Sequence, residues 1–508
     1  METFPAAAAH IYSSSSLYFL LLVLAIPLAL FFLRKKKNSN LPPGPAGWPI
    51  VGNLLQIRLT GQTFFGYVEK QHKKYGGIFT IKVGSRPLII VANRELAHEA
   101  LIQKGAVFAS RPPVEGMRKL FSSNQMSINS AAYGPTWRTL RRNLVSETLS
   151  PAAMKSFREG REWGVEMLMQ CLKTEAEQNE GVVKVVEHLR YAAFCILLYM
   201  CFGLRLDQKT VRDVETVMRE LLLSGAGLSL DDTFPVLKVF YRKRRARMEG
   251  IRRRLEETLV ALINRRRAAL AEGRGEECRA YVDSLFSLRV EGGRCLSDGE
   301  MVTLCSEFIN AGTDTTSTTM QWVMANLVKH QNIQSKVYEE IVGVAGKERA
   351  VEEEEVSGMK YLEAVVKEAL RRHSPGKFVL THAVTEACDL GGYHFPAGTI
   401  VNFLIWEMGN DPSVWENPSE FVPERYMSRD VDMTGSKEIR MMPFGVGRRI
   451  CPGLGLAMLH VELIVARLVQ KFMWESKPGE TVDFAEKQEF TMVMKNPLQA
   501  VIKERASA

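Results

Sequence analysis

The stretch FGVGRRICPG, from Phe444 to Gly453, places one cysteine among glycines and arginines near the end of a 508-residue chain. A lone cysteine is usually a small, buried, apolar residue. The other seven cysteines are scattered along the chain and form no CxxC pair or zinc-like spacing with histidine. Cys451 is therefore the cysteine whose surroundings indicate a special role.

Three roles compete for Cys451. A catalytic thiol needs a general base and usually lies at a helix N-terminus, and Cys451 does precede a predicted helix at residues 453–472. A structural cysteine would need no glycines around it. A thiolate that binds a metal would need them, because glycine lets backbone N–H groups point at the sulfur.

The N-terminal segment predicts a membrane anchor. Leu17–Leu33 is uncharged and apolar, and the basic residues 34–37 follow it directly. Because these charges come after the apolar run, we expect an uncleaved transmembrane helix within residues 1–33, with a short luminal end and a cytosolic body. Residues 34–52 are expected to form a basic stop and proline-rich hinge, and residues 53–508 the main domain.

The composition is that of a globular protein, with 46% hydrophobic and 24% charged residues and a net charge of +9. The densest basic run, RKRRARMEGIRRR at 242–254, contains no interleaved aromatic residues for base stacking. A solvated helix face, near anionic lipid or an acidic partner, is favoured, and no nucleic-acid partner is expected. Cysteines facing a reducing cytosol are not expected to form disulfides.

A hairpin is predicted at residues 78–93, and helix signals dominate from about residue 95. Residues 296–330 read as one long helix, opened by Ser297 and Glu300 at the spacing of a capping box. Its middle, AGTDTTSTT, contains glycine and threonine, which are poor helix formers. Either these threonines bond to carbonyls one turn earlier in a polar helix contact, or the helix carries an acid and an alcohol over a reaction site.

Together these motifs resemble the haem-thiolate monooxygenases called cytochromes P-450. The family's pattern F-x-x-G-x-R-x-C-x-G is met at Phe444, Gly447, Arg449, Cys451 and Gly453. The long-helix motif is met at Ala311, Gly312, Asp314, Thr315 and Thr316, the ExxR pair at Glu368 and Arg371, and the WxxxR pair at Trp137 and Arg141.

The resemblance implies a mainly α fold with a small β-rich side and a buried haem b. Cys451 would be the iron ligand, and the residues implied in cofactor binding are Trp137, Arg141, Arg449, Phe444, Gly445 and Gly453. Asp314 and Thr315 match the family's proton-delivery pair. Glu368, Arg371 and Arg425 match a buried structural triad.

The resemblance also implies partners. No nucleotide-binding loop is visible, so we expect electrons from NADPH through a separate membrane-bound reductase, and a place in the endoplasmic reticulum membrane. Intact Asp314 and Thr315 argue against the alternative of a membrane haem protein that binds a ligand without turnover.

Within the superfamily, CSEFINAGTDTT and KFVLTHAVTE look most like the plant family numbered seventy-seven, which oxidises fatty acids within the chain. Gly409-Asn410 departs from the arginine that many relatives carry before Asp-Pro. The predicted substrate pocket includes Phe121, Met126, Phe378, Leu380 and Met492. These apolar residues suit a medium or long fatty acid, with Arg118 or Lys119 as a carboxylate anchor or merely facing solvent. A terpenoid or phenolic substrate is the alternative.

Overall fold

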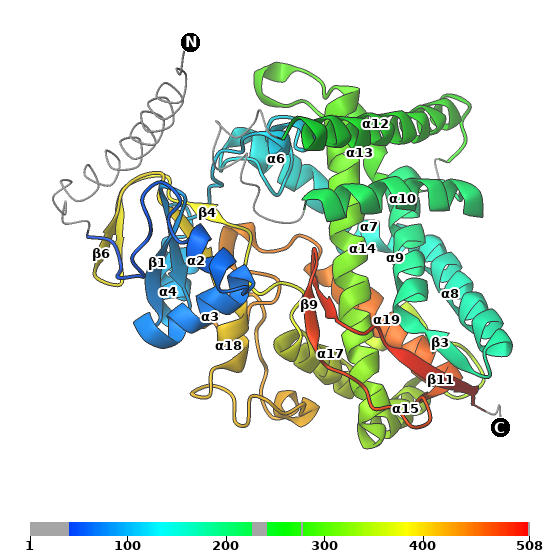
Figure 1. Ribbon diagram of the computed structural model, residues 1–508. Helices are drawn as coiled ribbons and strands as arrows, with labels where there is room; N and C mark the ends of the chain where they lie inside the picture. Colours follow the sequence, from blue (N-terminus) through cyan, green and yellow to red (C-terminus); the bar gives the residue numbers. More distant parts are fainter. Residues whose placement is uncertain (1–39, 226–240, 276–277, 506–508) are drawn as a thin grey trace, which may run out of the picture.

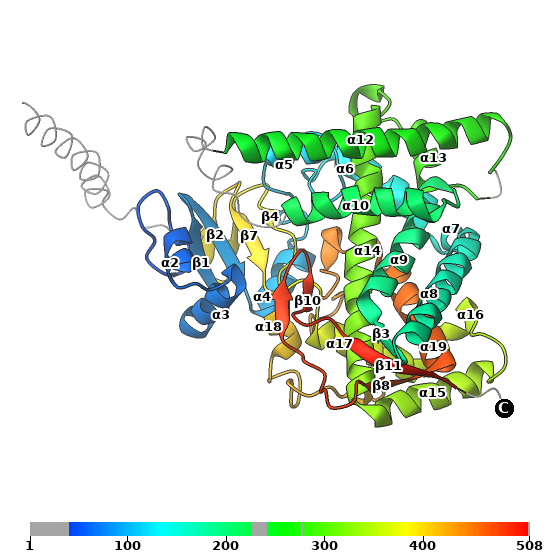
Figure 2. The ribbon, with the colours of Figure 1, turned by 45° about the vertical axis from the view of Figure 1, so that its right-hand side comes forward.

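The computed structural model describes residues 40–225, 241–275 and 278–505 (Figure 1). The predicted anchor at 1–33 and the basic residues after it lie outside this part. The described chain forms a helical body and a smaller β-rich side, as expected. Figure 2 shows the two parts side by side, with the first strands and helices of the chain on the β-rich side.

The main sheet of the β-rich side has the strand order β1-β2-β7-β4. Its strands are β1 (Ile78–Val83), β2 (Arg86–Val91), β7 (Ile400–Phe403) and β4 (His382–Ala383). β1 and β2 form the predicted antiparallel hairpin, whereas β2 pairs in parallel with β7. Helices α2 (Leu54–Leu59) and α3 (Phe64–Tyr75) belong to this side, and Tyr67 and Val68 of α3 are buried with Phe79 of β1. The sheet thus joins the start of the chain to residues near 400.

The long helix α14 (Asp298–Lys329) runs through the helical body (Figure 2). The Ser297 side chain accepts from the Glu300 N–H, and the Glu300 side chain accepts from the Ser297 N–H, so the predicted capping box is confirmed. Helices α9 (Val185–Phe202), α17 (Lys360–Arg372) and α19 (Leu454–Lys471) pack against α14. Helices α10 (Gln208–Gly225) and α12 (Arg242–Ala271) cross one end of it.

The close approach of α9 explains why α14 contains a glycine, Gly312, in its middle. A Cβ at this position would lie 2.7 Å from Leu197 Cδ1 of α9. Such a separation is shorter than van der Waals contact, so glycine permits the close approach of the two helices. α9 itself is long and apolar enough to span a membrane, but 83% of it is buried inside the body. It is a core helix.

Further elements complete the described fold. The helices are α4 (Arg94–His98), α5 (Met117–Phe121), α6 (Pro135–Leu144), α7 (Pro151–Ser156), α8 (Arg158–Gln178), α13 (Tyr281–Phe286), α15 (Gln331–Ala345), α16 (Glu353–Val356) and α18 (Ile405–Asn410). The small sheets pair β3 (Val182–Lys184) and β8 (Phe472–Ser476) with β11 (Gln499–Glu504), β9 (Glu486–Gln488) with β10 (Met492–Met494), and β5 (Cys388–Leu390) with β6 (Tyr393–Phe395).

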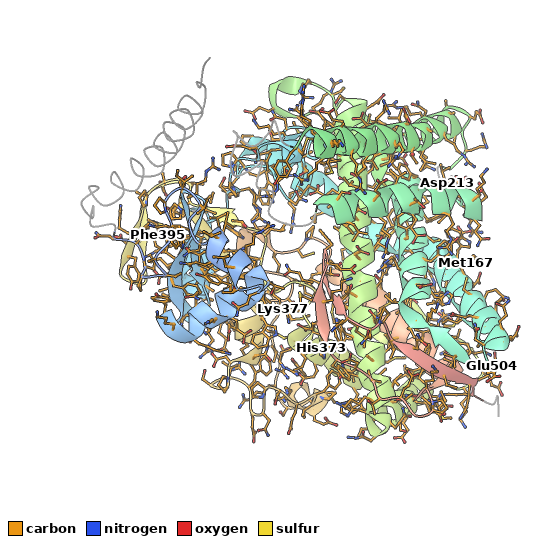
Figure 3. All side chains as sticks on the ribbon, in the orientation of Figure 1. Met167, Asp213, His373, Lys377, Phe395 and Glu504 are labelled. Carbon is orange, nitrogen blue, oxygen red and sulfur yellow. The ribbon has the colours of Figure 1, made fainter. Side chains whose placement is uncertain are left out.

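Lys377 lies where the β-rich side meets the helical body, and Figure 3 shows side chains filling this boundary. Its Nζ lies 2.7 Å from Glu486 Oε2 of β9 and above the ring of Phe65 of α3. The ion pair between Lys377, which is largely buried, and Glu486 therefore connects the two parts of the molecule. All eight cysteines are unpaired, as expected.

Candidate functional site

The Cys451 loop is held by its own backbone. The Cys451 N–H donates to the Phe444 carbonyl at 2.8 Å, and the Ile450 N–H donates to the Gly447 carbonyl at 3.1 Å. Gly447 has φ +72°, and a Cβ there would lie 2.1 Å from the Leu101 carbonyl oxygen, so no larger residue fits. The spacing FGVG thus specifies a tight loop that packs on residue 101.

The sulfur of Cys451 is largely buried, beside the Gly453 N–H and the charge of Arg141. Burial raises the pKa of the Cys451 thiol, whereas the Gly453 N–H and the charge of Arg141 lower it. An ideal Cβ on Gly453 would lie 3.8 Å from the sulfur, an ordinary van der Waals contact, so space around the sulfur does not by itself require glycine here. Backbone N–H groups and a nearby cation are the features that stabilise a metal-bound thiolate.

Helix α6 brings Trp137 and Arg141 to the same loop, because residues four apart share one helix face. Arg141 Nη2 donates to the Ile450 carbonyl at 2.8 Å. The Arg449 guanidinium lies over the Trp137 ring, 4.4 Å from its centroid. Trp137 Nε1 is buried and has no hydrogen-bond partner among the described residues. A buried donor of this kind indicates a missing acceptor.

Arg449 belongs to a cluster of cations that the motifs predicted only in part. Burial, together with the charges of Arg111 and Arg141, lowers the pKa of Arg449 to about 9. Burial also lowers the pKa of Arg111 to about 10. His382 lies beside the two, and burial together with the Arg111 charge lowers its pKa to about 3. This excess of positive charge favours an anionic ligand.

Two members of this cluster, Arg111 and His382, were missed by sequence reasoning. Arg111 Nη1 donates to the Leu380 carbonyl at 2.6 Å, and His382 Nδ1 lies 2.6 Å from the Phe108 carbonyl oxygen. These contacts join segments about 270 residues apart in the chain. No local spacing could have indicated them, although KFVLTHAVTE does contain His382.

The middle of α14 exposes one face in an otherwise buried helix. Ala311 is exposed and Thr315 is partly buried, whereas residues 316–328 are all buried. Thr315 Oγ1 donates to the Ala311 carbonyl at 2.7 Å, and Thr313 Oγ1 donates to the Ile309 carbonyl at 2.8 Å. The threonines therefore do bond one turn back, and Thr315 also lies on the accessible face.

Asp314 points away from that face toward a narrow cleft. Its Oδ1 accepts from Arg190 Nε of α9 at 3.2 Å. Burial raises the pKa of Asp314, while Arg190 and Arg219 lower it. Glu489 and Thr491 also line the cleft. An acid with a raised pKa beside an alcohol can hold and pass a proton.

These residues fit haem b. Trp137 Nε1 lacks an acceptor, and the pKa of Arg449 and of Arg111 stays low although Glu307 lies near both, so haem carboxylates would suit both the free donor and the cations. Cys451 offers a sulfur in an open loop, and α19, which starts directly after the loop, packs against α14. The residues that would hold the cofactor are Cys451, Trp137, Arg141 and Arg449.

Glu368, Arg371 and Arg425 come together as expected. Arg371 Nη2 lies 2.7 Å and Arg425 Nε 3.1 Å from Glu368 Oε1, and the side chains of Glu368 and Arg371 are fully buried. Arg371 Nη1 also donates to the Gly409 carbonyl at 2.8 Å. A Cβ on Gly409 would lie 2.9 Å from the Arg371 carbonyl oxygen, so this glycine belongs to the triad's surroundings.

The five predicted pocket residues do not form one cluster. Phe121 packs beside Met117 and Met248, and Met126 packs against the main core. The Phe378 ring lies 5.8 Å from that of Phe64, in the β-rich side. The Met492 carbonyl accepts from Trp322 Nε1, and Leu380 is 60% exposed. Their assignment to a substrate pocket stays a prediction.

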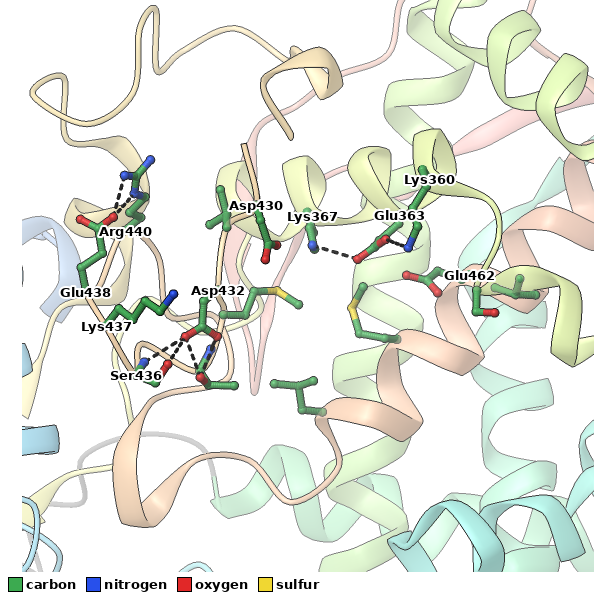
Figure 4. Close-up of a pocket in the computed structure, with 17 residues that line it drawn as sticks. Lys360, Glu363, Lys367, Asp430, Asp432, Ser436, Lys437, Glu438, Arg440 and Glu462 are labelled. Atoms are coloured by element: carbon green, nitrogen blue, oxygen red, sulfur yellow. Dashed lines mark hydrogen bonds and ion pairs between the residues drawn. The ribbon is translucent and has the colours of Figure 1, made fainter. Parts of the chain in front are cut away.

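A separate cleft of about 740 Å³ lies between α17, α19 and the loop at 430–440 (Figure 4). Leu454 and Met458 of α19 line it together with Glu462. Burial and the neighbouring Glu363 raise the pKa of Glu462 to about 8. This cleft holds none of the residues that would bind haem.

Comparison with known proteins agrees with this site. The cytochrome P450 family profile matches residues 42–503. Cytochrome P450 89A9 of Arabidopsis thaliana is 43% identical over 94% of this chain and 95% of its own. Isoflavone 2'-hydroxylase of Glycyrrhiza echinata is 31% identical over 94% of this chain and 96% of its own. A zebrafish cytochrome P450 solved with progesterone has a TM-score of 0.72 at 24% identity, covering 85% of this chain and 97% of that one, and shares the fold.

The chain therefore belongs to the cytochrome P450 family. It is a haem-thiolate monooxygenase, and the family uses haem b with electrons from a separate NADPH-dependent reductase. Neither the Arabidopsis nor the Glycyrrhiza relative supports the expected membership of the family numbered seventy-seven.

Proposed function

We propose that this monooxygenase oxidises a neutral, hydrophobic small molecule with a ring system. The observation that carries the proposal is the charge on α14. Glu307 lies on the same helix face as Ala311 and Thr315. An acid on this face disfavours an anionic substrate group nearby. The similarity to an isoflavone 2'-hydroxylase supports a ring-containing substrate.

Different residues would ligate the haem, compensate its carboxylates and deliver protons during oxygen insertion. Bound haem would supply the redox-active iron at which dioxygen is reduced. Cys451 would ligate that iron, Trp137 would donate a hydrogen bond to a haem carboxylate, and Arg141 and Arg449 would compensate the carboxylate charge. Asp314 holds a proton beside the narrow cleft, and the Thr315 hydroxyl can both donate and accept a hydrogen bond on the accessible face.

In-chain oxidation of a medium- or long-chain fatty acid is the second candidate. Phe121 and Met126 are apolar and partly buried, which suits an aliphatic chain. The expected carboxylate anchor has less support, because Arg118 and Lys119 are both exposed on α5 while Met117 packs inward against Met248. A fatty acid would therefore have to keep its carboxylate near the surface.

A substrate panel tests the two candidates on membranes supplied with a reductase and NADPH. It contains an isoflavone, a series of fatty acids and the methyl ester of each acid, and products are identified by mass spectrometry. Turnover of the isoflavone and of the neutral esters, with slower turnover of the free acids, is expected. Turnover of free acids alone would overturn the proposal and favour the second candidate.

The same proposal includes an endoplasmic reticulum membrane location with a cytosolic body, and a membrane-bound reductase as partner. The apolar run at 17–33 and the basic residues 34–37 support it. Fractionation of cells that express the full chain should place it with microsomal membranes. Recovery in the soluble fraction would contradict this part.

A further inference from the structure

Glu307 joins α14 to the loop that precedes α6. The Ile128 N–H donates to Glu307 Oε2 at 2.8 Å, and the Asn129 N–H donates to Oε1 at 2.7 Å. Each carboxylate oxygen thus receives one backbone donor from the loop. Hydrogen bonds to an ionised acceptor are stronger than neutral ones.

The carbonyl groups of the same loop hold two of the cations at the haem site. Arg449 donates to the Ile128 carbonyl at 3.1 Å and to the Ala131 carbonyl at 2.6 Å. Arg111 Nε donates to the Asn129 carbonyl at 2.9 Å. Glu307 of α14 therefore accepts from the N–H groups of residues 128 and 129, while the carbonyls of residues 128, 129 and 131 accept from Arg449 and Arg111.

Charge supports this connection. Burial raises the pKa of Glu307 to about 7, whereas the Ile128 and Asn129 N–H groups and the charges of Arg449 and Arg111 lower it. Tyr281 of α13 is the further titratable group coupled to it. The charge of Glu307 in turn opposes the lowering of the pKa of Arg111 and of Arg449 by burial, so it partly compensates both cations.

We propose that Glu307 is a positioning residue of the haem site. Its carboxylate fixes the loop at 128–131, and the loop holds Arg111 and Arg449, of which Arg449 would compensate the haem carboxylates. Glu307 acts through these arginines and touches no reacting atom. The inference does not depend on the proposed substrate class.

The test compares Glu307→Gln and Glu307→Leu with the wild-type holoenzyme. Glutamine keeps one acceptor but sets an NH2 group against a backbone N–H, whereas leucine removes both acceptors. Haem transfer to apomyoglobin should become about tenfold faster or more in Glu307→Leu and change less in Glu307→Gln, as expected when bonds to a charged group are lost. Amide hydrogen exchange should increase in residues 122–134 and stay unchanged in the buried part of α14.

Glu300→Gln is the matched control, because Glu300 lies on the same helix but pairs with Arg294 and caps the helix. It should leave haem transfer and exchange at 122–134 unchanged. The wild-type loop should also become better protected as the pH rises through about 7, because the ionised carboxylate accepts both N–H groups, and Glu307→Gln should lack this dependence. The proposal would be overturned if both Glu307 variants transferred haem at the wild-type rate. It would also be overturned if amide hydrogen exchange increased equally throughout α14.

Discussion

Asp314 Oδ1 of α14 accepts a hydrogen bond from Arg190 Nε of α9 at 3.2 Å. The pairing opposes the effect of burial, which raises the pKa of Asp314. Arg190→Leu should therefore raise this pKa further, so that the ionised carboxylate forms only at higher pH. The alkaline limb of the pH profile for product formed per NADPH should move to higher pH, because Asp314 then keeps the proton that it passes on to a higher pH.

Arg205→Leu is a suitable control, because Arg205 follows the same helix but pairs with Glu159 at the surface. It should leave the profile in place. An unchanged profile in Arg190→Leu would show that Asp314 does not limit proton delivery in this range.

Thr315→Ala should leave haem content and substrate binding nearly intact while more NADPH is lost to peroxide. The hydroxyl lies on the accessible face of α14, so its removal takes a proton carrier from the reaction site. Thr313→Ala removes the same kind of back-bond from a buried position and should keep normal coupling. Equal coupling in both variants would exclude Thr315 from the mechanism.

The local motifs were predictable from the sequence, and the contacts between distant segments were not. The Cys451 loop, the capped helix α14 and the Glu368–Arg371 pair each depend on spacing within a few residues. The loop at 128–131 is held by Glu307, about 180 residues later in the chain. Only tertiary packing brings these groups together, so no pattern in the sequence indicates the contact.

The polar middle of α14 shows a second limit. The sequence allowed either a polar helix contact or a reaction site, and the structure shows back-bonded threonines together with an accessible face on which Thr315 lies. Gly312 serves the packing of Leu197, while Ala311 and Thr315 form the accessible face. Residue type alone cannot separate these roles, because helix packing decides which side chains are covered.

Cys451→Ala should abolish thiolate ligation, because this loop offers no other thiol. The reduced wild-type protein with carbon monoxide should show the red-shifted Soret band of a thiolate ligand, and the variant should lack it. Cys388→Ala, at another unpaired cysteine, should keep the band. A variant at Cys451 that retains it would show that another residue ligates the iron.

Glu368→Gln should destabilise the fold without touching the chemistry. Glu368 accepts from Arg371, from Arg425 and from the Val422 N–H, so the change leaves a buried guanidinium without its counter-charge. Breaking a buried pair costs about 3–5 kcal/mol. The yield of haem-loaded protein should fall sharply.

The matched control is Glu363→Gln on the same helix, where Glu363 pairs with Lys360 and Lys367 nearer the surface. The yield of haem-loaded Glu363→Gln should fall far less, since exposed ion pairs contribute little to stability. Similar yields for the two variants would contradict a structural role for the triad.

Glu462 should make the protein less stable at alkaline pH. Burial and Glu363 raise its pKa from 4.5 to about 8, while Lys367 and Lys360 oppose the shift. Between these values the folded chain binds more protons than the unfolded chain, so the free energy of unfolding falls as the pH rises and levels off above about 8. Glutamine at this position cannot ionise, so the Tm of Glu462→Gln should exceed that of the wild type by a margin that grows from pH 5 to about pH 9. The corresponding difference in the free energy of unfolding is on the order of a few kcal/mol at most. Glu475→Gln, at a surface pair with Lys503, should follow the wild-type curve. Parallel curves for wild type and Glu462→Gln would show that Glu462 is ionised at neutral pH in the folded protein.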